Sequence, residues 1–523
     1  MKQRIPLLAA LALALAGNAA AQAPDTTVPP KNWWHLDQQA DRYAGIGTER
    51  AYRELLAGKK PRREVVVAII DSGVEIDHPD LDGVLWKNPG EIAGNGKDDD
   101  GNGYVDDIHG WDFIGGRDGR DVKEDTYEVT RLYAACRAAA EPPAGTQCAE
   151  IRRDFEKRRA EAQANVMQVQ QMEAALTQVY TTLRQHLGTQ ELTTAAVKAI
   201  RAMNPAVARA RDIYLEIAGL GFTLEDVIDQ RKAMEGQLQY GMNPDFDPRP
   251  IVGDNYADPT ERFYGNREVE GPDAEHGTHV AGIVAAERGN GAGVDGVAPA
   301  RIMAIRAVPD GDERDKDVAN AIRYAVDNGA RVINMSFGKS HSPQKRVVDE
   351  AVRYAERKGV LLVHAAGNDG ADLRKEANFP NRTYEGGGEA KNWIEVGASY
   401  WAADTLAAPF SNYGKGKVDI FAPGVNIYST VTESGYDAHQ GTSMAAPVVS
   451  GVAALVMAYY PELTADEVRA VILESATRHA DRKVVRPGTE GEQVAFGELS
   501  TTGGVVNAYA ALKLAEQRAA QKK

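Results

Sequence analysis

The sequence of 523 residues has little cysteine and no excess of positive charge. Its two cysteines, Cys136 and Cys148, are too few for a cysteine-rich zinc site. Its 60 lysines and arginines are outnumbered by 75 aspartates and glutamates, and the net charge is −15. Binding to nucleic acid depends on neutralising phosphates, so we expect no nucleic-acid partner. After residue 21 no apolar run reaches the length of about 18 residues that a membrane-spanning helix needs, so we expect no membrane span in the mature protein.

The first 21 residues have the pattern of an export signal. Lys2 and Arg4 precede an apolar run over 5–16, and small residues follow. A run of about 12 residues is too short to span a bilayer and suits the core of a signal peptide. We expect residues 1–21 to be removed after Ala21 and the protein to be periplasmic or extracellular; a buried N-terminal helix is the alternative. In such a compartment the two cysteines either form a disulfide or stay as free thiols.

Most of the remaining sequence alternates strand-like and helical segments. A run of mostly β-branched residues at 64–70 ends at Asp71, whereas residues 94–113 are rich in Gly, Asp and Asn and predict a loop. Further strand-like runs lie at 302–305, 332–335, 360–363 and 393–396, and helical segments at 315–328, 346–358 and 505–519. This alternation predicts an α/β fold with a doubly wound, mostly parallel sheet. In such sheets catalytic groups gather at the carboxyl ends of the strands, where Asp71 stands.

A helical block of different character, placed at 113–267, interrupts this pattern and separates residues 22–112 from 268–523. Gly188 is a natural helix C-cap, and 223–226 resembles an acidic capping box that opens a helix ending near Gly241. The block predicts an inserted helical hairpin or small bundle. A cap, a substrate filter, a partner-docking arm and a spacer are all open interpretations of its role. Apolar residues recur on one helix face at Met172, Leu176, Val179, Leu183 and Leu187.

Three short motifs carry the residues of a candidate Asp/His/Ser triad. They are Asp71-Ser72-Gly73, His276-Gly277-Thr278-His279 and Gly441-Thr442-Ser443-Met444. A serine hydroxyl is a weak nucleophile until a neighbouring base takes its proton, and histidine can be that base near neutral pH. An aspartate then holds the imidazole ring in the required tautomer. Each motif alone is weak evidence, but in this order, known for such triads, they indicate nucleophilic catalysis.

Together these motifs resemble those of the subtilisin-like serine proteases, the subtilases, over roughly residues 30–112 and 268–515. The resemblance implies a subtilisin-like fold and an exported serine endopeptidase that cleaves peptide or protein substrates through an acyl-enzyme on Ser443. Asp71 would orient the base, His276 would be the general base and acid, and Asn368 would donate to the oxyanion. The resemblance also implies that Ser336, Phe337 and Gly338 pair with the substrate backbone and that Ala365, Ala366 and Gly367 line the specificity pocket.

Two alternative functions remain open. A latent or non-catalytic binding or scaffold protein on this fold would need an occluded cleft, because all four catalytic positions are filled. Another serine hydrolase, such as an esterase, is disfavoured because the Gly-x-Ser-x-Gly elbow is missing around Ser443.

The stretch from Asn32 resembles the start of a mature protease domain, so a folded inhibitory propeptide is not expected. His279 is interpreted as a structural residue.

The loop at 94–107 is a candidate site for a structural Ca²⁺ ion. Asp98, Asp100 and Asn102 alternate, and the Tyr104 carbonyl could add a ligand, as in the first half of an EF-hand loop. The usual closing glutamate is missing, so Asp106 or Asp107 would close the site; a solvated acidic turn is the alternative. The resemblance to subtilases implies a second Ca²⁺ site formed by Asp80 and Asn290.

Overall fold

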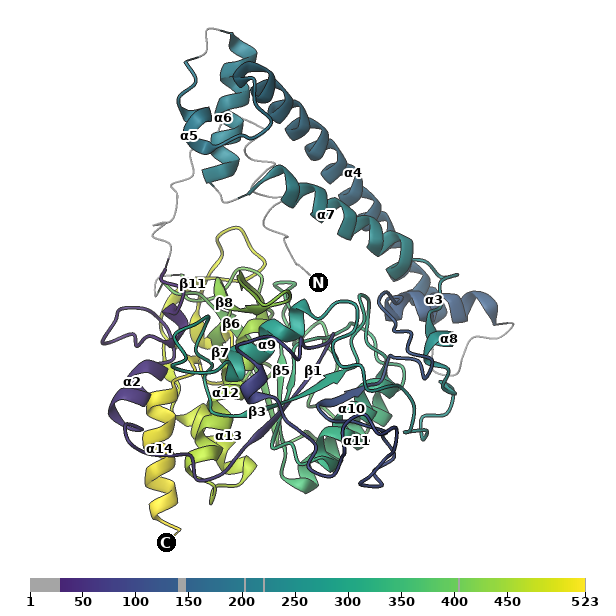
Figure 1. Ribbon diagram of the computed structural model, residues 1–523, viewed down its shortest axis with the longest axis vertical. Helices are drawn as coiled ribbons and strands as arrows, with labels where there is room; N and C mark the ends of the chain where they lie inside the picture. Colours follow the sequence, from purple (N-terminus) through teal and green to yellow (C-terminus); the bar gives the residue numbers. More distant parts are fainter. Residues whose placement is uncertain (1–28, 140–146, 202–203, 220–221, 403–404, 523) are drawn as a thin grey trace. The chain divides into compact units, whose positions relative to one another are not determined.

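A computed structural model describes the chain except for residues 1–28, 140–146, 202–203, 220–221, 403–404 and 523 (Figure 1). The predicted signal peptide, 1–21, lies outside the described residues. The described residues fold into two compact units, one within 29–128 and 247–522 and one within 129–246. The helical block expected at 113–267 is wider than the second unit, because its ends at 113–128 and 247–267 belong to the first unit.

The first unit is built on a nine-stranded sheet with the order β10-β13-β7-β6-β5-β4-β1-β3-β2. Neighbouring strands are parallel, except for β10 and β13. The predicted α/β fold with a mostly parallel sheet is confirmed. The strands are β1 (Val66–Asp71), β2 (Gly110–Asp112), β3 (Arg301–Arg306), β4 (Val332–Met335), β5 (Leu361–Ala365), β6 (Trp393–Ser399), β7 (Ile420–Pro423), β10 (Thr477–Arg478) and β13 (Gly504–Val505).

Strand β1 lies at the point where the chain changes direction across the sheet. The next two long strands pair with it on opposite sides, β3 on one and β4 on the other. The apolar run of β1 is buried on both faces: Val67 and Ile69 join one core, and Ala68 and Ile70 join the other. Ligand sites form at the carboxyl ends of strands at such a switch point, so the fold positions Asp71 for a functional role.

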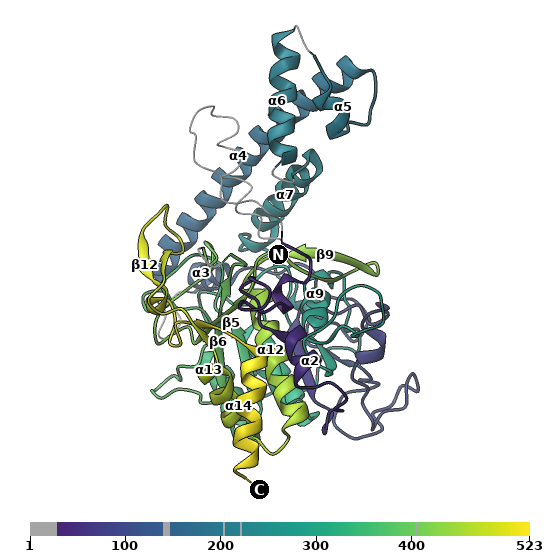
Figure 2. The same cartoon turned by 90° about the vertical axis from the view of Figure 1, so that its left-hand side faces the viewer.

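Helices cover both faces of this sheet (Figure 1). Helices α9, α12, α13 and α14 contribute to the core on one face, and α10 and α11 to the core on the other. Helix α14 packs against α2, α12 and α13 (Figure 2). These helices are α2 (Thr48–Glu54), α9 (Glu275–Ala285), α10 (Asp315–Asp327), α11 (Lys345–Lys358), α12 (Thr442–Tyr459), α13 (Ala465–Glu474) and α14 (Ala508–Ala520).

Shorter elements complete the first unit. The hairpin β8–β9 packs against α9 through β8. A second hairpin is formed by β11 and β12. The short elements are α8 (Arg249–Val252), η1 (Trp33–His35), η2 (Asp82–Val84), η4 (Phe496–Glu498), β8 (Ile427–Val431), β9 (Gly435–His439), β11 (Lys483–Val485) and β12 (Gln493–Ala495).

Helix α12 is a core helix of the first unit. It contacts β4, β5, β6 and β7 of the sheet as well as α9. In the described part of the chain it alone is long and apolar enough to cross a membrane by length and composition. Within the protein, however, 94% of that 18-residue stretch is buried. Its hydrophobicity is therefore accounted for by packing against the sheet.

The second unit is a group of helices around the long helix α4. The predicted apolar face of α4 is confirmed: Met172 and Leu176 pack with Ile217 and Val227, and further along, Val179 and Leu183 are buried against α5 and α6. A left-handed Gly188 ends α4, and a capping box of Thr223 and Asp226 opens α7. The elements are α3 (Glu128–Ala138, beginning at the boundary of the unit), α4 (Cys148–Leu187), α5 (Thr194–Lys198), α6 (Pro205–Gly219), α7 (Leu224–Gly236) and a π-helical turn, η3 (Gln237–Gly241).

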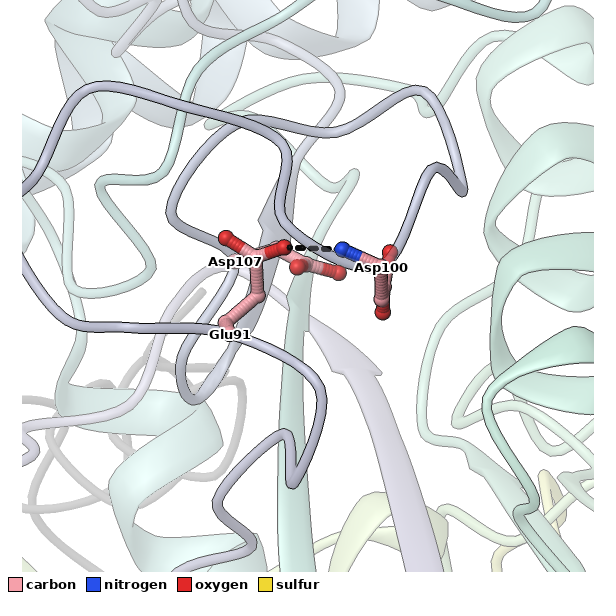
Figure 3. Close-up of side chains that lie close together, drawn as sticks. All are labelled: Glu91, Asp100 and Asp107. Atoms are coloured by element: carbon pink, nitrogen blue, oxygen red, sulfur yellow. Dashed lines mark hydrogen bonds between the residues drawn. The ribbon is translucent and has the colours of Figure 1, made fainter.

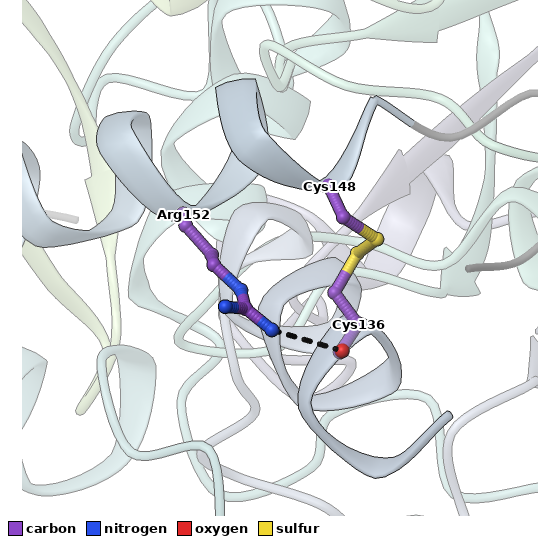
Figure 4. Close-up of a disulfide and its surroundings, with 3 residues drawn as sticks. All are labelled: Cys136, Cys148 and Arg152. Carbon is purple, nitrogen blue, oxygen red and sulfur yellow. Dashed lines mark hydrogen bonds between the residues drawn. A yellow bond between two sulfur atoms is a disulfide. The ribbon is translucent and has the colours of Figure 1, made fainter. Parts of the chain in front are cut away.

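A disulfide joins Cys136 of α3 to Cys148, the first residue of α4 (Figure 4). The Cα atoms are 5.7 Å apart, which is ordinary for a disulfide. Arg152, one turn further along α4, donates a hydrogen bond of 3.5 Å to the Cys136 carbonyl. Of the two alternatives that the sequence left open, the structure contains the disulfide.

The sequence predicted a loop throughout residues 94–113. This prediction is wrong at its end, because Gly110–Asp112 form the edge strand β2. Gly110 pairs with Ala304 of β3. A Cβ atom at Gly110 would lie 1.6 Å from the Ala304 carbonyl oxygen, so only glycine allows this approach. A strand of three residues has too few positions to show the alternation by which strands are recognised.

Candidate active site

The three residues of the predicted triad lie at the ends of packed elements. Asp71 is the last residue of β1, His276 is the second residue of α9, and Ser443 is the second residue of α12. Helix α9 packs against both β1 and α12. The fold therefore brings together three short segments that are far apart in the sequence.

Asp71 and His276 form a direct hydrogen bond. The distance from Asp71 Oδ1 to His276 Nδ1 is 2.6 Å, and the backbone N–H of Ser72 donates to the same oxygen at 2.8 Å. Asp71 is buried, whereas His276 is 23% exposed. A Cβ atom at Gly277 would lie 2.0 Å from the Gly73 carbonyl oxygen, so this glycine lets α9 sit directly on the turn after β1. The pair can orient an imidazole whose second nitrogen remains available.

Ser443 and Ser336 are joined by two hydrogen bonds. The Ser443 hydroxyl donates to the Ser336 carbonyl at 3.1 Å, and the Ser336 hydroxyl donates to the Ser443 carbonyl at 2.8 Å. Pro447, four residues after Ser443 in α12, has no N–H to donate to that carbonyl, so the hydroxyl of Ser336 replaces the missing helical bond. Behind it, Asn334 donates to the Ser336 hydroxyl and accepts from Ser450, at 2.9 and 2.8 Å.

The hydroxyl of Ser443 is therefore engaged by Ser336. Within the described ranges it makes no hydrogen bond to His276. Catalytic hydrogen bonds are often long or misaligned without substrate and tighten when substrate binds. Ser443 is only partly buried, and a turn of its side chain about the Cα–Cβ bond would free the hydroxyl from the Ser336 carbonyl.

The side-chain amide of Asn368 is held in one orientation by Thr442. Its Oδ1 accepts from the Thr442 backbone N–H at 2.8 Å and from the Thr442 hydroxyl at 2.9 Å. The Nδ2 group thus points away from Thr442, and no described residue accepts a hydrogen bond from it. The backbone N–H of Ser443, in the first turn of α12, makes no hydrogen bond with the described residues either. Two N–H donors beside Ser443 are thus available to a ligand, at the helix end that favours negative charge.

The segment Ser336-Phe337-Gly338 leaves the sheet at the end of β4. Among the described residues the backbone groups of Phe337 and Gly338 make no hydrogen bond, so they are open to an extended chain. Regular pairing resumes at Lys339, which exchanges two backbone bonds of 2.9 Å with Phe379. Such an open edge suits main-chain recognition of a peptide.

Ala365, Ala366 and Gly367 follow at the end of β5, and Asn378 connects them to the first segment. The Asn378 amide donates to the Ala366 carbonyl at 3.2 Å, and a Cβ atom at Gly338 would lie 2.5 Å from Asn378 Oδ1. Sequence reasoning missed Asn378, because it lies in an irregular stretch with no motif. The Asn378 side chain thus bridges the two segments.

The acidic loop brings three carboxylates together, and one of them was not predicted. Oxygens of Glu91, Asp100 and Asp107 lie within 4.8 Å of one another (Figure 3). The amide of Asn88 donates to Asp100 and Asp107 at 3.0 and 2.9 Å. Burial raises the pKa of Asp107 to about 6. Glu91 was missed because it precedes the run of acidic residues that marks the loop.

Other residues predicted for this site have different partners. Asp98 accepts from the backbone N–H groups of Gly101, Asn102 and Gly103, and thus caps the turn. Asp106 accepts from two backbone N–H groups and pairs with Arg267 at 2.5 Å. The Asn102 amide donates to Asp100 and Asp107. The aromatic side chain of Tyr104 is buried.

The chemistry of this cluster fits a hard divalent cation. Three carboxylates close together repel each other, and burial of Asp107 adds a desolvation penalty for its charged form. Ca²⁺ prefers oxygen ligands of this kind, so Glu91, Asp100 and Asp107 are the residues that would hold it.

At the second predicted metal position Asp80 and Asn290 do meet. The Asn290 amide donates to Asp80 Oδ1 at 2.5 Å, and the Val294 backbone N–H donates to Asp80 Oδ2 at 3.1 Å. A Cβ atom at Gly293 would lie 2.2 Å from the same Oδ2. These hydrogen bonds satisfy the buried carboxylate within the protein, so the pair is less suited to a cation than the cluster around Asp100.

His279 has structural contacts. Its Nε2 lies 3.0 Å from the Ile427 carbonyl and 3.2 Å from the Asp437 carbonyl, and its ring stacks on His439 with centroids 4.2 Å apart. Burial, and then the charges of His439 and His276, lower its pKa well below the usual value. A neutral, buried ring tied to two carbonyls joins α9 to the β8–β9 hairpin.

A family model described as the subtilase family (Peptidase_S8) matches residues 62–494. The chain belongs to the subtilase family. This subtilase is 43% identical to the thermophilic serine proteinase of Bacillus sp. (strain AK1) over 219 residues, which are 41% of this chain and 48% of that protein. It is 38% identical to the major intracellular serine protease of Bacillus subtilis (strain 168) over 227 residues, 42% of this chain and 66% of that protein.

The subtilase chain spans about half the length of the thermophilic serine proteinase. It also spans about half the length of two further relatives that it matches. A solved structure titled for proteases from Pseudoalteromonas arctica PAMC 21717 covers 92% of this chain and 97% of its own at 20% identity. Its TM-score is 0.48.

Proposed function

We propose that this subtilase is a serine endopeptidase that hydrolyses peptide bonds through an acyl-enzyme on Ser443. The observation that carries the proposal is the 2.6 Å hydrogen bond between Asp71 and His276, at the end of β1; α9, which carries His276, packs against α12, whose second residue is Ser443. Curated relatives named as serine proteases support the same reaction class. The substrates are peptides or proteins.

In the proposed mechanism the Ser443 hydroxyl leaves Ser336 and donates to His276 Nε2. The hydroxyl oxygen then attacks the substrate carbonyl carbon while His276 takes the proton. Asp71 keeps Nδ1 protonated and stabilises the imidazolium that results. His276 next gives the proton to the leaving amine, and the acyl group stays on Ser443. Water, deprotonated by His276, attacks the acyl carbonyl. The bond to Ser443 then breaks, His276 returns the proton to the Ser443 oxygen, and the acid product leaves the free enzyme.

Asn368 and the Ser443 backbone N–H are proposed to hold the negative oxygen of the tetrahedral intermediate. Thr442 fixes the Asn368 amide before the reaction, so no reorganisation is needed when charge develops. Preorganised donors of this kind stabilise the transition state more than the ground state, and this difference raises the rate.

Substrate binding is proposed to use two segments. The free backbone groups of Phe337 and Gly338 would pair with an extended peptide, and Ala365, Ala366 and Gly367 would line the pocket for the neighbouring side chain. Asn378 joins the two segments and would be a polar group beside that pocket.

A structural Ca²⁺ ion at Glu91, Asp100 and Asp107 completes the proposal. Its chemistry there is the neutralisation of three close carboxylates, and it takes no part in the reaction. For the pair of Asp80 and Asn290 we retain the Ca²⁺ site only as a weaker prediction. The ion would tie the loop at 91–107 to the edge of the sheet near β2.

We also propose that the protein is exported. The pattern of residues 1–21 and the disulfide between Cys136 and Cys148 both suit an oxidising compartment. The intracellular relative shows that family membership alone does not fix the compartment. Docking of a partner on the helical unit stays a prediction.

A latent protein on the same fold is the second candidate, and the hydrogen bond from Ser443 to Ser336 favours it as a resting state. A peptide-hydrolysis assay separates the two. We expect the purified protein to cleave casein and a peptide anilide, and Ser443→Ala to lower kcat by on the order of 10⁶. Cleavage of a simple ester but of no peptide would favour an esterase, and the absence of any turnover would favour the latent protein.

A further inference from the structure

A cleft rich in arginine lies on the side of the first unit covered by α10 and α11. Its volume is about 360 Å³, and it is lined by Arg262, Arg323, Glu350, Arg353, Tyr354 and Arg357. The arginines that the two helices contribute come from their C-terminal halves, and the helices lead back into β4 and β5. The cleft is therefore at the end of the sheet opposite to the strand ends that carry Asp71, and it is distinct from the active site.

The positive charges in this cleft exceed the nearby negative charges. Four guanidinium groups face one lining carboxylate, Glu350, which also pairs with the exposed Arg346 at 3.3 Å. Asp327, at the end of α10, pairs with Arg262 at 2.8 Å and accepts the Tyr354 hydroxyl at 2.5 Å. The Nε of Arg262 is buried and has no hydrogen-bond partner among the described residues.

Three of the arginines have no carboxylate partner among the described residues. Arg323 donates only one long bond, of 3.4 Å, to the Ala319 carbonyl. Arg353 stacks on the Tyr384 ring at 3.9 Å and Arg357 lies 5.8 Å from the Tyr354 ring centre. Their hydrogen-bond donors are thus left for a ligand, while stacking on Tyr384 holds the guanidinium plane of Arg353 in place.

The positive guanidinium groups of Arg262 and Arg323 lie close enough to repel each other. Burial, and then the positive charge of Arg262, lower the pKa of Arg323 from its ordinary value. An anion between these groups would offset both effects, because it would bind the charged form of each guanidinium. Guanidinium groups bind tetrahedral oxyanions through paired N–H donors, and this geometry is more selective than a single ammonium charge.

We propose that the cleft binds a small phosphate- or sulfate-type oxyanion between Arg262, Arg323, Arg353 and Arg357. The cleft is the size of a small ligand, and its donors converge from two helices and a loop. This site is independent of peptide hydrolysis, so the proposal stands whether or not the protein is a protease. The source of the oxyanion is either the free inorganic ion or the phosphoryl group of a small organic ester.

Calorimetric titration and thermal unfolding of the full chain test the proposal with sodium pyrophosphate, sodium phosphate and phenyl phosphate. Sodium chloride at matched ionic strength is the reference for screening. We expect saturable binding and a higher Tm with at least one phosphate probe. Arg323→Gln with Arg353→Gln should weaken binding at least tenfold, and Arg353→Lys should weaken it partly. Arg120→Gln, which removes an exposed arginine paired with Asp118 elsewhere in the unit, should leave binding unchanged.

Stronger binding of phenyl phosphate than of phosphate would identify an organic ester as the source, and the reverse order would identify the free ion. If sodium chloride raises the Tm as much as sodium phosphate does, the proposal is overturned. It is also overturned if the double variant binds phosphate as tightly as the wild-type protein. Tighter binding of an oligoglutamate peptide than of any phosphate probe would also overturn it, because the cleft would then be a docking surface for an acidic chain.

Discussion

Ser336 supplies the hydrogen bond that Ser443 cannot receive inside its own helix. The carbonyl of Ser443 lacks its helical partner because Pro447 has no N–H, and the Ser336 hydroxyl donates to it at 2.8 Å. The residue at the end of β4 therefore holds the first turn of α12. This contact links the proposed substrate-pairing segment directly to the proposed nucleophile.

Replacement of Ser336 by alanine should weaken both stability and catalysis. The partly buried carbonyl of Ser443 would be left without its donor, which costs about 1 kcal/mol of unfolding free energy. Urea unfolding and kcat measure the two effects. Ser450→Ala is the matched control, because it removes a buried hydroxyl from Asn334 without touching Ser443. We expect both variants to lose stability but only Ser336→Ala to lose kcat; an equal kcat for the two would contradict the account.

Replacement of Asn368 by alanine should lower kcat and change KM little. Its Nδ2 donor would act on the oxyanion, which exists only along the reaction path. We expect a loss of about 100-fold to 1000-fold, the range known for such a donor in a subtilisin. Thr442→Val, which removes the hydroxyl that orients the Asn368 oxygen, should give a smaller loss of kcat because the backbone N–H still holds the amide. A change in KM alone would assign Asn368 to substrate binding.

Removal of divalent cations should lower the melting temperature. Without a cation Glu91, Asp100 and Asp107 repel one another. We expect excess chelator to lower Tm by several degrees, added Ca²⁺ to restore it, and Asp100→Asn to lose most of this response. Asp118→Asn is the control, since Asp118 is an exposed acid paired with Arg120. An unchanged melt of the wild-type protein in chelator would remove the metal site from the account.

Acidification should destabilise the fold through His279. Burial and the neighbouring His439 and His276 hold its folded-state pKa well below 6.5. Below pH of about 6.5 only the unfolded chain gains this proton, so the unfolding free energy falls by about 1.4 kcal/mol per pH unit for this group. His35, also buried with a lowered pKa, adds to the slope in the same direction. His279→Gln should reduce the slope of the unfolding free energy against pH, between pH 6.5 and 5, by about that amount. Identical slopes for the variant and the wild-type protein would contradict the lowered pKa of His279.

Much of the fold and of the site could be predicted because its signals are local. The apolar face of α4 and the caps at Gly188 and Thr223 are short patterns that specify their own structure. Likewise, the residues around Asp71, His276 and Ser443 form compact motifs. Their positions at strand and helix ends follow from the α/β pattern alone.

The features that sequence reasoning missed depend on distant contacts. Asn378 matters only because it lies between two segments that precede it in the chain. Folding of the loop brings Glu91 into the acidic cluster. The carboxylates of Asp98 and Asp106 instead accept hydrogen bonds from backbone N–H groups. The arginines of the α10–α11 cleft come from a loop and two helices, so no run of positive charge in the sequence marks them.

Labelling with a fluorophosphonate, read by intact and peptide mass spectrometry, tests the central claim most directly. We expect one adduct per chain, on the peptide that contains Ser443, and its loss in His276→Ala, in which the hydroxyl has no base. The samples should be folded and loaded with Ca²⁺. An unlabelled Ser443 in such a sample, or labelling that does not depend on His276, would contradict an assembled Asp71/His276/Ser443 triad.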